Sequence, residues 1–198
     1  QAFAVGEFLD VLGLDKVHVV GNSMGGWVGL ELAADGRALS YTGLCPAGLW
    51  RPLQSRSLLL EFNRHAAQAT GLLGEFLMLL PALREVVFAA ALARPYRLDF
   101  GTARAALAAQ RAASGYDEAH DGIVGVRFDR AREIPASVPV TIAFGDDDQF
   151  LPPHTAQLQH LAPIHSRWVI MPRVGHAPMW DDPEATVALV RATIAGQY

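Results

Sequence analysis

The feature of the sequence that most constrains the fold is a short, β-branched apolar run that changes to a helical pattern across a glycine-containing turn. Val17 to Val20 is followed by Gly21, which predicts a buried strand. From Met24 the apolar residues recur at helical spacing until Asp35 and Gly36, so three residues separate the strand from the helix. Such a sharp passage from strand to helix is typical of a parallel α/β sheet.

The rest of the chain supplies further elements of the same kind. Three more segments have the length of buried strands and are apolar on both faces, at residues 42–45, 140–144 and 168–171. A helical pattern at residues 3–12 ends at Gly13, and the last helix begins with Asp182 as its N-cap and Pro183 at its first position. The sequence therefore predicts the α/β fold class, with a mostly parallel sheet and flanking helices.

The alternation of strands and helices breaks in the middle of the chain, where only helical patterns occur. These lie near residues 58–69, 72–80, 82–93 and 103–113. Prolines and glycines mark both ends of this block, as expected where an excursion leaves and rejoins a sheet. We therefore expect a core at residues 1–49, an inserted helical lid at residues 50–134, and the remainder of the core at residues 135–198.

The turn at residues 21–25 has the form G-x-S-x-G, with glycines two positions either side of Ser23. Side chains at Gly21 and Gly25 would collide as the strand reverses into the helix, so we expect these glycines to hold Ser23 in a strained turn. The amide of Met24, at the helix start, is then placed to donate to an oxyanion. An ordinary turn with an N-cap serine is the alternative, which the position between strand and helix disfavours.

A serine nucleophile needs a base and an acid that orients the base, and candidates for both follow later strands. Asp146, Asp147 and Asp148 come after the third predicted strand, and His176 comes after the fourth. The carboxyl ends of parallel strands meet at the edge where α/β sheets place their sites. Composition alone does not separate the three adjacent carboxylates.

With this order of serine, acid and histidine, the chain resembles the α/β-hydrolase family. The resemblance assigns the acid to Asp148, through the G-x-x-D-x-x-x-P arrangement of residues 145–152, and the base to His176 in a G-H-x-P loop. Asp146 and Asp147 are then expected in a solvated turn. The resemblance also implies a partial α/β-hydrolase fold and a catalytic triad that needs no cofactor.

The activity that the resemblance implies is hydrolysis of a carboxylic ester or a similar small, apolar acyl substrate through an acyl-enzyme. Ser23 would be the nucleophile, His176 the base, Asp148 the orienting acid and the Met24 amide an oxyanion-hole donor. The same residues would serve a carbon-carbon bond hydrolase, a thioesterase or a haloperoxidase-like enzyme. A non-catalytic binding or receptor protein on a truncated hydrolase scaffold is the alternative from another class. Because the turn carries serine, a dehalogenase or epoxide hydrolase with an aspartate nucleophile is disfavoured.

Several other classes lack support in the sequence. The net charge is −4 and the basic residues are scattered, so no nucleic-acid partner is expected. No uninterrupted apolar stretch is long enough for a membrane span, and no dinucleotide, P-loop or metal-ligand motif occurs, so neither cofactor nor metal is expected. Cys45 is the single cysteine, which excludes an internal disulfide, and we expect it to be a buried packing residue.

The remaining histidines and the apolar residues at 72–80 also allow predictions. Ordinary structural roles are expected for the histidines other than His176, namely His18, His65, His120, His154, His160 and His165. Apolar residues cover more than one face of the segment at 72–80, and some are expected to line an acyl pocket: Leu72, Leu73, Phe76, Leu77, Leu79 and Leu80.

The chain departs from the family pattern upstream of the nucleophile. Only 22 residues precede Ser23, whereas family members carry further strands and an H-G-x-x-G loop there. We therefore expect a fragment of a longer enzyme, in preference to a shortened relative without activity. The strand at Val17 to Val20 is then expected to be an uncovered sheet edge that favours self-association. No signal peptide is readable, and a cytoplasmic location is the expectation.

Overall fold

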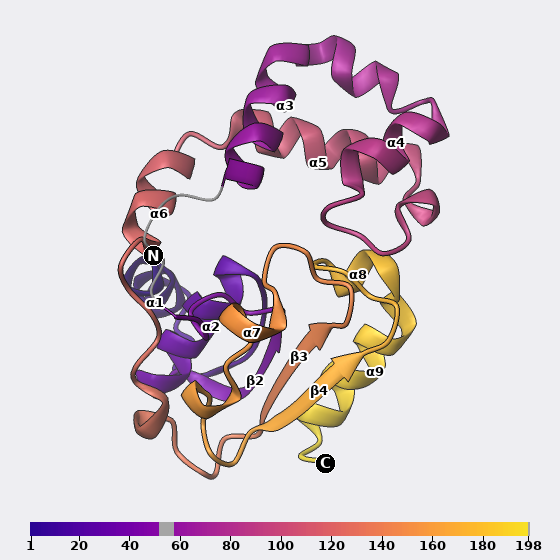
Figure 1. Ribbon diagram of the computed structural model, residues 1–198. Coiled ribbons are helices and arrows are strands. Elements are labelled where there is room, and N and C mark those ends of the chain that lie inside the picture. The colour runs from indigo at the N-terminus through magenta and orange to yellow at the C-terminus, as the bar shows by residue number, and fades with distance from the viewer. Residues whose placement is uncertain (52–57, 198) are drawn as a thin grey trace.

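A single parallel sheet organises the computed structural model, which describes residues 1–51 and 58–197 (Figure 1). Its order is β1-β2-β3-β4, and every pairing is parallel. The strands are β1 (Val17–Asn22), β2 (Ala38–Leu44), β3 (Val140–Gly145) and β4 (Arg167–Met171). The four predicted strands and the α/β class are confirmed, although β2 begins at Ala38 rather than at Thr42.

Side chains of the central strands alternate between two helical layers. On one face, Tyr41 of β2 belongs to the same core as Leu30 of α2 (Met24–Ala34), and its hydroxyl donates to the carbonyl oxygen of Gly26 at 2.8 Å. On the other face, Leu44 packs in a separate cluster with Leu189 of α9 (Pro183–Ile194). This period of two is what a strand between two helices requires.

The outer strands differ from the prediction that every strand is apolar and buried on both faces. Val20 of β1 is 47% exposed and Ile170 of β4 is 49% exposed, whereas β3 is buried at every position. The reason is their place in the sheet, since β1 and β4 each have a single neighbouring strand among the described residues. The predicted edge at β1 is therefore present in the structure.

Helices flank the sheet as the sequence predicts. The first, α1 (Ala2–Val11), contacts α2, and Gly13 beyond its end has a φ of +69°. At the start of α9, Asp182 accepts a hydrogen bond from the amide of Ala185 at 3.1 Å, which confirms the predicted N-cap. None of the helices in the described part of the chain has the length and apolar character that crossing a membrane requires.

Helices occupy the block between β2 and β3. They are α3 (Leu58–Leu77), α4 (Pro81–Phe88), η1 (Pro95–Arg97), α5 (Phe100–Ala112), α6 (Tyr116–Ile123) and η2 (Ala131–Glu133). Non-helical Gly71, with a φ of +54°, divides α3 into two helical parts, as the patterns near 58–69 and 72–80 predict, although the second part ends at Leu77. The prediction missed α6, and the helix predicted at 82–93 ends at Phe88.

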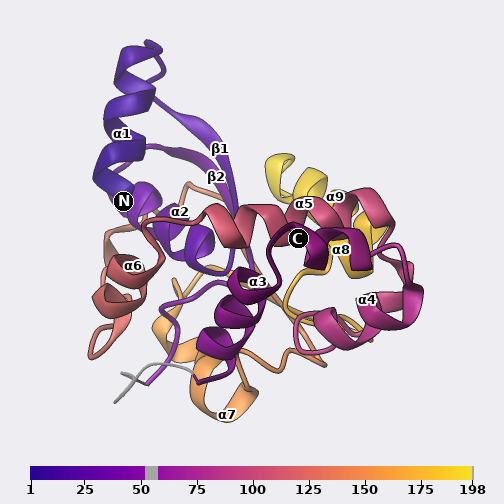
Figure 2. The same ribbon diagram turned by 90° about the horizontal axis from the view of Figure 1, so that it is seen from above.

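The helical block covers the edge of the sheet at which the strands end. Figure 1 shows α3, α4 and α5 above this edge, and Figure 2 shows α6 beside α1 and α2. Three short elements follow in the core: α7 (Pro153–Ala156), η3 (Gln159–Leu161) and α8 (Pro178–Asp181). The loops that carry the predicted acid and base thus lie between the sheet and the helical block.

Candidate active site

Ser23 lies in the sharp turn between β1 and α2, in a backbone conformation that non-glycine residues rarely adopt. Its φ is +52° and its ψ is −120°. The carbonyl oxygen of Ser23 accepts hydrogen bonds from the amides of Gly26, Trp27 and Ala47, at 3.0, 3.2 and 2.8 Å. These contacts hold the strained turn in place, as the sequence predicts for a nucleophile elbow.

The glycines that permit this turn are only partly those that the motif predicts. A Cβ atom on Gly21 would collide with the carbonyl oxygen of Gly25, and one on Gly26 would lie 2.7 Å from the Cβ of Pro46. Around Gly25 itself, a Cβ would meet no atom within 4 Å. The expectation of crowding at Gly25 is therefore wrong, because Gly26, not Gly25, lies against the loop after β2.

The structure brings His176 and Asp148 together. Nδ1 of His176 lies 2.9 Å from Oδ2 of Asp148, whose side chain is fully buried. The other carboxylate oxygen accepts hydrogen bonds from the amides of Phe150 and Leu151, both at 2.9 Å. This geometry places the proton on Nδ1, because a carboxylate only accepts, and so leaves Nε2 as the basic nitrogen.

The neighbouring carboxylates have other surroundings. Asp146 and Asp147 are exposed, as expected for a solvated turn. Asp146 also accepts a hydrogen bond from the amide of Val174 at 3.3 Å, so it helps to join the two loops after β3 and β4. Of the three adjacent aspartates, the imidazole therefore meets Asp148 alone.

The motif position before the nucleophile has a role that the sequence analysis missed. Nδ2 of Asn22 donates to the carbonyl oxygen of His176 at 2.8 Å and to that of Leu44 at 2.9 Å. These bonds join the end of β1 to the end of β2 and to the loop that carries the base. The sequence offers no signal for this role beyond the polar residue inside G-x-S-x-G.

The buried carboxylate of Asp181 joins the loop that contains His176 to the helical block. Its oxygens accept hydrogen bonds from the amides of Ala93, Arg94 and Gly175, at 3.0, 2.7 and 2.7 Å. The amide of His176 in turn donates to the carbonyl oxygen of Ala91 at 2.8 Å. His176 is therefore held between the core and the segment after α4.

Ser23 and His176 border the same cavity, of about 640 Å³, and so does Met24 at the start of α2. No hydrogen bond of the described residues joins Oγ of Ser23 to the imidazole. Such bonds are often long before substrate binds. Apolar side chains from the core and from the helical block form most of the wall: Ala47, Trp50, Ala113, Ala119, Ile123, Phe150, Leu151, Pro152 and Ala156.

The apolar residues at 72–80 do not line this cavity, which corrects the expectation of an acyl pocket there. The six that the sequence singled out are exposed, with Leu72 63% and Leu73 67% accessible. Four of the six belong to the part of α3 beyond the kink at Gly71, and the other two follow the end of this helix. The wall is formed instead by α6 and the loops after β2 and β3.

Cys45 lies close to Asp148 and His176 and is completely buried, as predicted. Burial first, and then the nearby Asp148 carboxylate, raise the pKa of its thiol well above the ordinary value. Ligand atoms of Cys45, Asp148 and His176 lie within 4.8 Å of one another, a spacing that suits a metal ion. Two of these three groups, Asp148 and His176, already contact each other at 2.9 Å.

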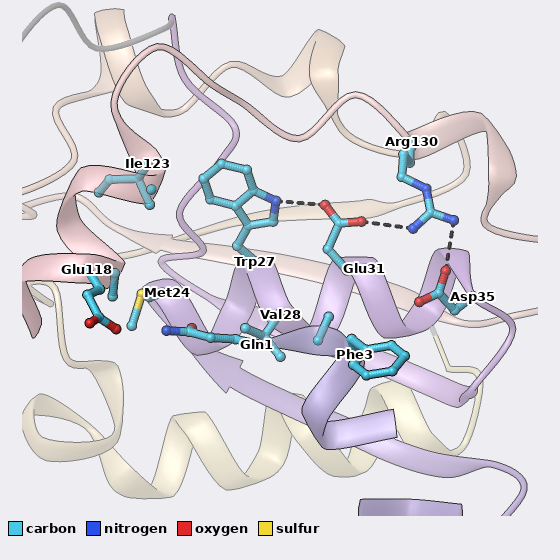
Figure 3. Close-up of a pocket in the computed structure, with 13 residues that line it drawn as sticks. Gln1, Phe3, Met24, Trp27, Val28, Glu31, Asp35, Glu118, Ile123 and Arg130 are labelled. Atoms are coloured by element: carbon cyan, nitrogen blue, oxygen red, sulfur yellow. Dashed lines mark hydrogen bonds and ion pairs between the residues drawn. The ribbon is translucent and has the colours of Figure 1, made fainter. Parts of the chain in front are cut away.

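A second cavity, of about 490 Å³, adjoins the first between α1, α2 and α6 (Figure 3). Arg130 lines this cavity, and its guanidinium contacts the carboxylates of Glu31 at 3.0 Å, Asp35 at 2.8 Å and Glu133 at 2.6 Å. The hydrogen bonds that the guanidinium donates to these carboxylates, first of all to Glu133, raise the pKa of Arg130 further above its usual value. Because these charges are paired with one another, this cavity offers less to a ligand than the one beside the elbow.

Comparison with known proteins gives a consistent picture of the fold. A family model described as "Alpha/beta hydrolase family" matches residues 2–189. Among curated proteins, the epoxide hydrolase EphH of Mycobacterium tuberculosis is 29% identical over an alignment of 202 positions, which covers 94% of this chain and 89% of that protein.

Solved structures with the same fold include enzymes of several kinds. A bacterial membrane phospholipase A superposes with a TM-score of 0.67 at 22% identity, covering 98% of this chain and 62% of that one. The meta-cleavage product hydrolase CumD from Pseudomonas fluorescens IP01 gives 0.66 at 16% identity, covering 97% and 68%. An alpha/beta hydrolase enzyme from a deep-sea metagenome library gives 0.69 at 18% identity, covering 100% and 71%. The chain thus spans less than two thirds of the phospholipase.

Proposed function

The chain belongs to the alpha/beta hydrolase family, and from this premise we propose that it is a serine hydrolase that cleaves carboxylic esters or similar small acyl compounds. The observation that carries the proposal is the 2.9 Å contact between His176 and the buried Asp148, beside the cavity that Ser23 also borders. A base with a fixed tautomer next to a strained serine suits acyl transfer. The apolar wall suits the acyl part of such a substrate.

The proposed reaction proceeds in two halves. Nε2 of His176 takes the proton of Ser23 as Oγ attacks the carbonyl carbon, and the amide of Met24 donates to the oxyanion that forms. The intermediate collapses, the C–O bond to the alcohol breaks, and His176 returns its proton to the leaving oxygen. Water then attacks the acyl-enzyme with the same base, which releases the acid and restores the serine. Asp148 stabilises the imidazolium in both halves.

The helical block supplies the proposed lid of this site. We propose the division into core residues 1–49 and 135–198 with a lid at residues 50–134. Its support is that α6 forms one wall of the cavity, while the elbow and the acid and base loops form the others. A substrate bound there would be enclosed by the lid on one side and by the sheet edge on the other.

Other reactions of the family differ in how well they suit this site. Carbon-carbon bond hydrolysis, thioester hydrolysis and haloperoxidase-like chemistry would use the same residues. Epoxide opening suits it poorly, despite the name of the curated relative. Attack by Ser23 on an epoxide forms an ether that water does not cleave, whereas a carboxylate nucleophile forms a hydrolysable ester. A non-catalytic binding protein remains the alternative from another class.

A fluorophosphonate probe tests the proposal, because it modifies a serine only where a base activates it. We expect stoichiometric labelling at Ser23 in the wild-type chain and none in Ser23→Ala. Labelling should slow strongly in His176→Ala, while Ser166→Ala, a change outside the cavity, serves as the matched control. Folded wild-type protein that takes up no label would contradict the proposal and favour the binding class.

A further inference from the structure

Arg51 gives the wall of the candidate active site a positive charge. It lies in the segment that follows β2 and borders the cavity that Ser23 and His176 also border. Of the described residues that line this cavity, none is an aspartate or a glutamate, and Arg51 is the single arginine or lysine. Because a guanidinium keeps its proton at neutral pH, a mostly apolar wall carries one permanent positive charge that no carboxylate of the wall neutralises.

The guanidinium of Arg51 has no partner in the described part of the chain, where it makes neither an ion pair nor a hydrogen bond. Two arginines of the helical block show the contrast, because Arg130 contacts three carboxylates and Arg111 contacts Glu75 at 2.7 Å. Arg191 of α9 is exposed, but it lies outside this cavity and is simply solvated. Arg51 is therefore a cation without a partner at a place where the proposed substrate would bind.

The backbone that carries this cation is fixed. The amide of Arg51 donates to the carbonyl oxygen of Thr155 at 2.9 Å. The preceding residue, Trp50, is 3% exposed, and its Nε1 donates to the carbonyl oxygen of Val126 at 2.8 Å. Thr155 also borders the cavity, and its hydroxyl adds a neutral donor to the same part of the wall. A cation on a fixed backbone can set the distance between an anionic group of the substrate and the candidate nucleophile.

The chemistry of the guanidinium narrows the ligand. A guanidinium only donates hydrogen bonds, and it gains most from an oxygen that carries a negative charge. A phosphate monoester carries up to two negative charges, and the described wall has no second arginine or lysine to balance the other one. A carboxylate carries one charge and accepts two parallel hydrogen bonds from an arginine, so it is the group that suits Arg51.

We propose that Arg51 is a specificity-determining residue of the site, and that it binds a carboxylate at the far end of the acyl chain of the substrate. The substrate class is thus a monoester of a dicarboxylic acid. Ser23 attacks its esterified carboxyl group, and Arg51 recognises its free one. The apolar wall then surrounds the methylene groups between the two. The inference rests on the proposed function, because that function places the acyl chain in this cavity.

The test measures kcat/KM for the mono-p-nitrophenyl esters of adipic, pimelic and suberic acids. Each is compared with the ester in which a primary amide replaces the free carboxyl group, so that the two members of a pair have the same length and differ in charge. We expect the wild type to prefer the acid by at least about threefold at one or more chain lengths. This gain is modest because Arg51 is exposed, so water competes for it.

Variants of Arg51 test whether the preference depends on its charge. In Arg51→Gln the ratio of acid to amide should fall to about one, whereas Arg51→Lys keeps the charge and should keep part of the preference. The matched control is Arg191→Gln, which removes the same charge on α9 and should leave the ratio as in the wild type. Because each ratio is taken within one protein, a loss of folded protein cancels.

Salt provides a second readout. The wild-type preference should weaken as the NaCl concentration is raised, because salt screens the attraction between an exposed guanidinium and a carboxylate. The ratio in Arg51→Gln should not respond to salt. A wild-type ratio below about threefold at all three chain lengths, a preference that survives in Arg51→Gln, or an equal loss in Arg191→Gln would overturn the assignment.

A failure of the proposed function is distinguishable from a failure of this inference. If the wild type hydrolyses none of the esters, calorimetry still tests Arg51 through the binding of the monomethyl esters of the same three acids, and of their amides, to Ser23→Ala. Tighter binding of an acid than of its amide, lost when Arg51→Gln is added, supports the inference without catalysis. Equal binding of the two compounds in every pair, or no binding of any acid, contradicts it.

Discussion

Asn22 and His176 are 154 residues apart in the chain, and the side-chain amide of the first donates to the carbonyl oxygen of the second at 2.8 Å. The residue that precedes the candidate nucleophile thus holds the loop of the candidate base. Because the same amide group also donates to Leu44, one side chain joins three strand ends at the site. The relative position of Ser23 and the imidazole depends on this contact.

Replacing Asn22 by alanine should disturb the position of the base more than the binding of substrate. We expect kcat to fall by about 10- to 100-fold, since small misplacements of a catalytic group are that costly. KM should change little, and the free energy of unfolding should fall by about 1–3 kcal/mol because two buried carbonyl oxygens lose a donor. Steady-state kinetics and urea denaturation measure both. A change in KM with unaltered kcat would contradict the positioning role.

The three adjacent aspartates allow a matched comparison of the proposed acid. Asp148→Asn keeps the shape of the side chain but reverses the hydrogen bond to Nδ1 of His176, so the imidazole presents the wrong tautomer to the serine. We expect kcat to fall by about 10⁴-fold. Asp147→Asn, at an exposed position, should leave kcat within about twofold of the wild type. Equal losses in the two variants would argue against Asp148 as the acid.

Local sequence patterns were sufficient to predict the four strands and most of the helices. The strand β1 and the turn after it depend on residues that are adjacent in the sequence. An apolar run followed by a glycine is therefore enough to predict them. Asp148 is selected from the three adjacent aspartates by the family resemblance, and the structure buries that aspartate and exposes Asp146 and Asp147. The N-cap at Asp182 is likewise a local feature.

The rest of the site depends on contacts between distant segments, which no local pattern records. His120 resembles any other histidine in the sequence, and only the docking of α6 beside α2 places it in the cavity. Leu72 and Leu73 suggested a pocket by composition, but both are exposed in the structure. Asp181 shows no pattern because its partners lie in the helical block.

The two glycines of α2 that follow Met24 give a matched test of the crowding at the elbow. Gly26→Ala places a Cβ 2.7 Å from that of Pro46, and we expect the free energy of unfolding to fall by about 1–3 kcal/mol. Gly25→Ala meets open space in a helix and should raise it by about 0.4–1 kcal/mol. Urea denaturation at one pH compares the two. A larger cost at Gly25 would show that the turn is crowded as the motif predicts.

The buried thiol of Cys45 predicts a loss of stability at alkaline pH. Its pKa is raised in the folded state, chiefly by burial, whereas the unfolded thiol titrates near about 8.5. Above that pH the unfolded chain releases a proton that the folded chain keeps, so the free energy of unfolding falls as pH rises.

Cys45→Ala isolates this effect, because the variant has no thiol to titrate. Between pH 8 and pH 9.5 the wild type should lose about 1 kcal/mol more stability than the variant does. Urea denaturation at the two pH values measures the difference, and the direct cost of the substitution cancels within each protein. Parallel pH dependence in the two proteins would contradict the raised pKa.

The most direct measurement of the central claim is the pre-steady-state hydrolysis of p-nitrophenyl acetate, followed by acid quenching and peptide mass spectrometry. The account predicts a burst of p-nitrophenol that approaches one equivalent per chain, and a single acetyl group on the peptide that contains Ser23. Turnover without any burst or acetylated peptide, or an acetyl group on another residue that persists in Ser23→Ala, would contradict it.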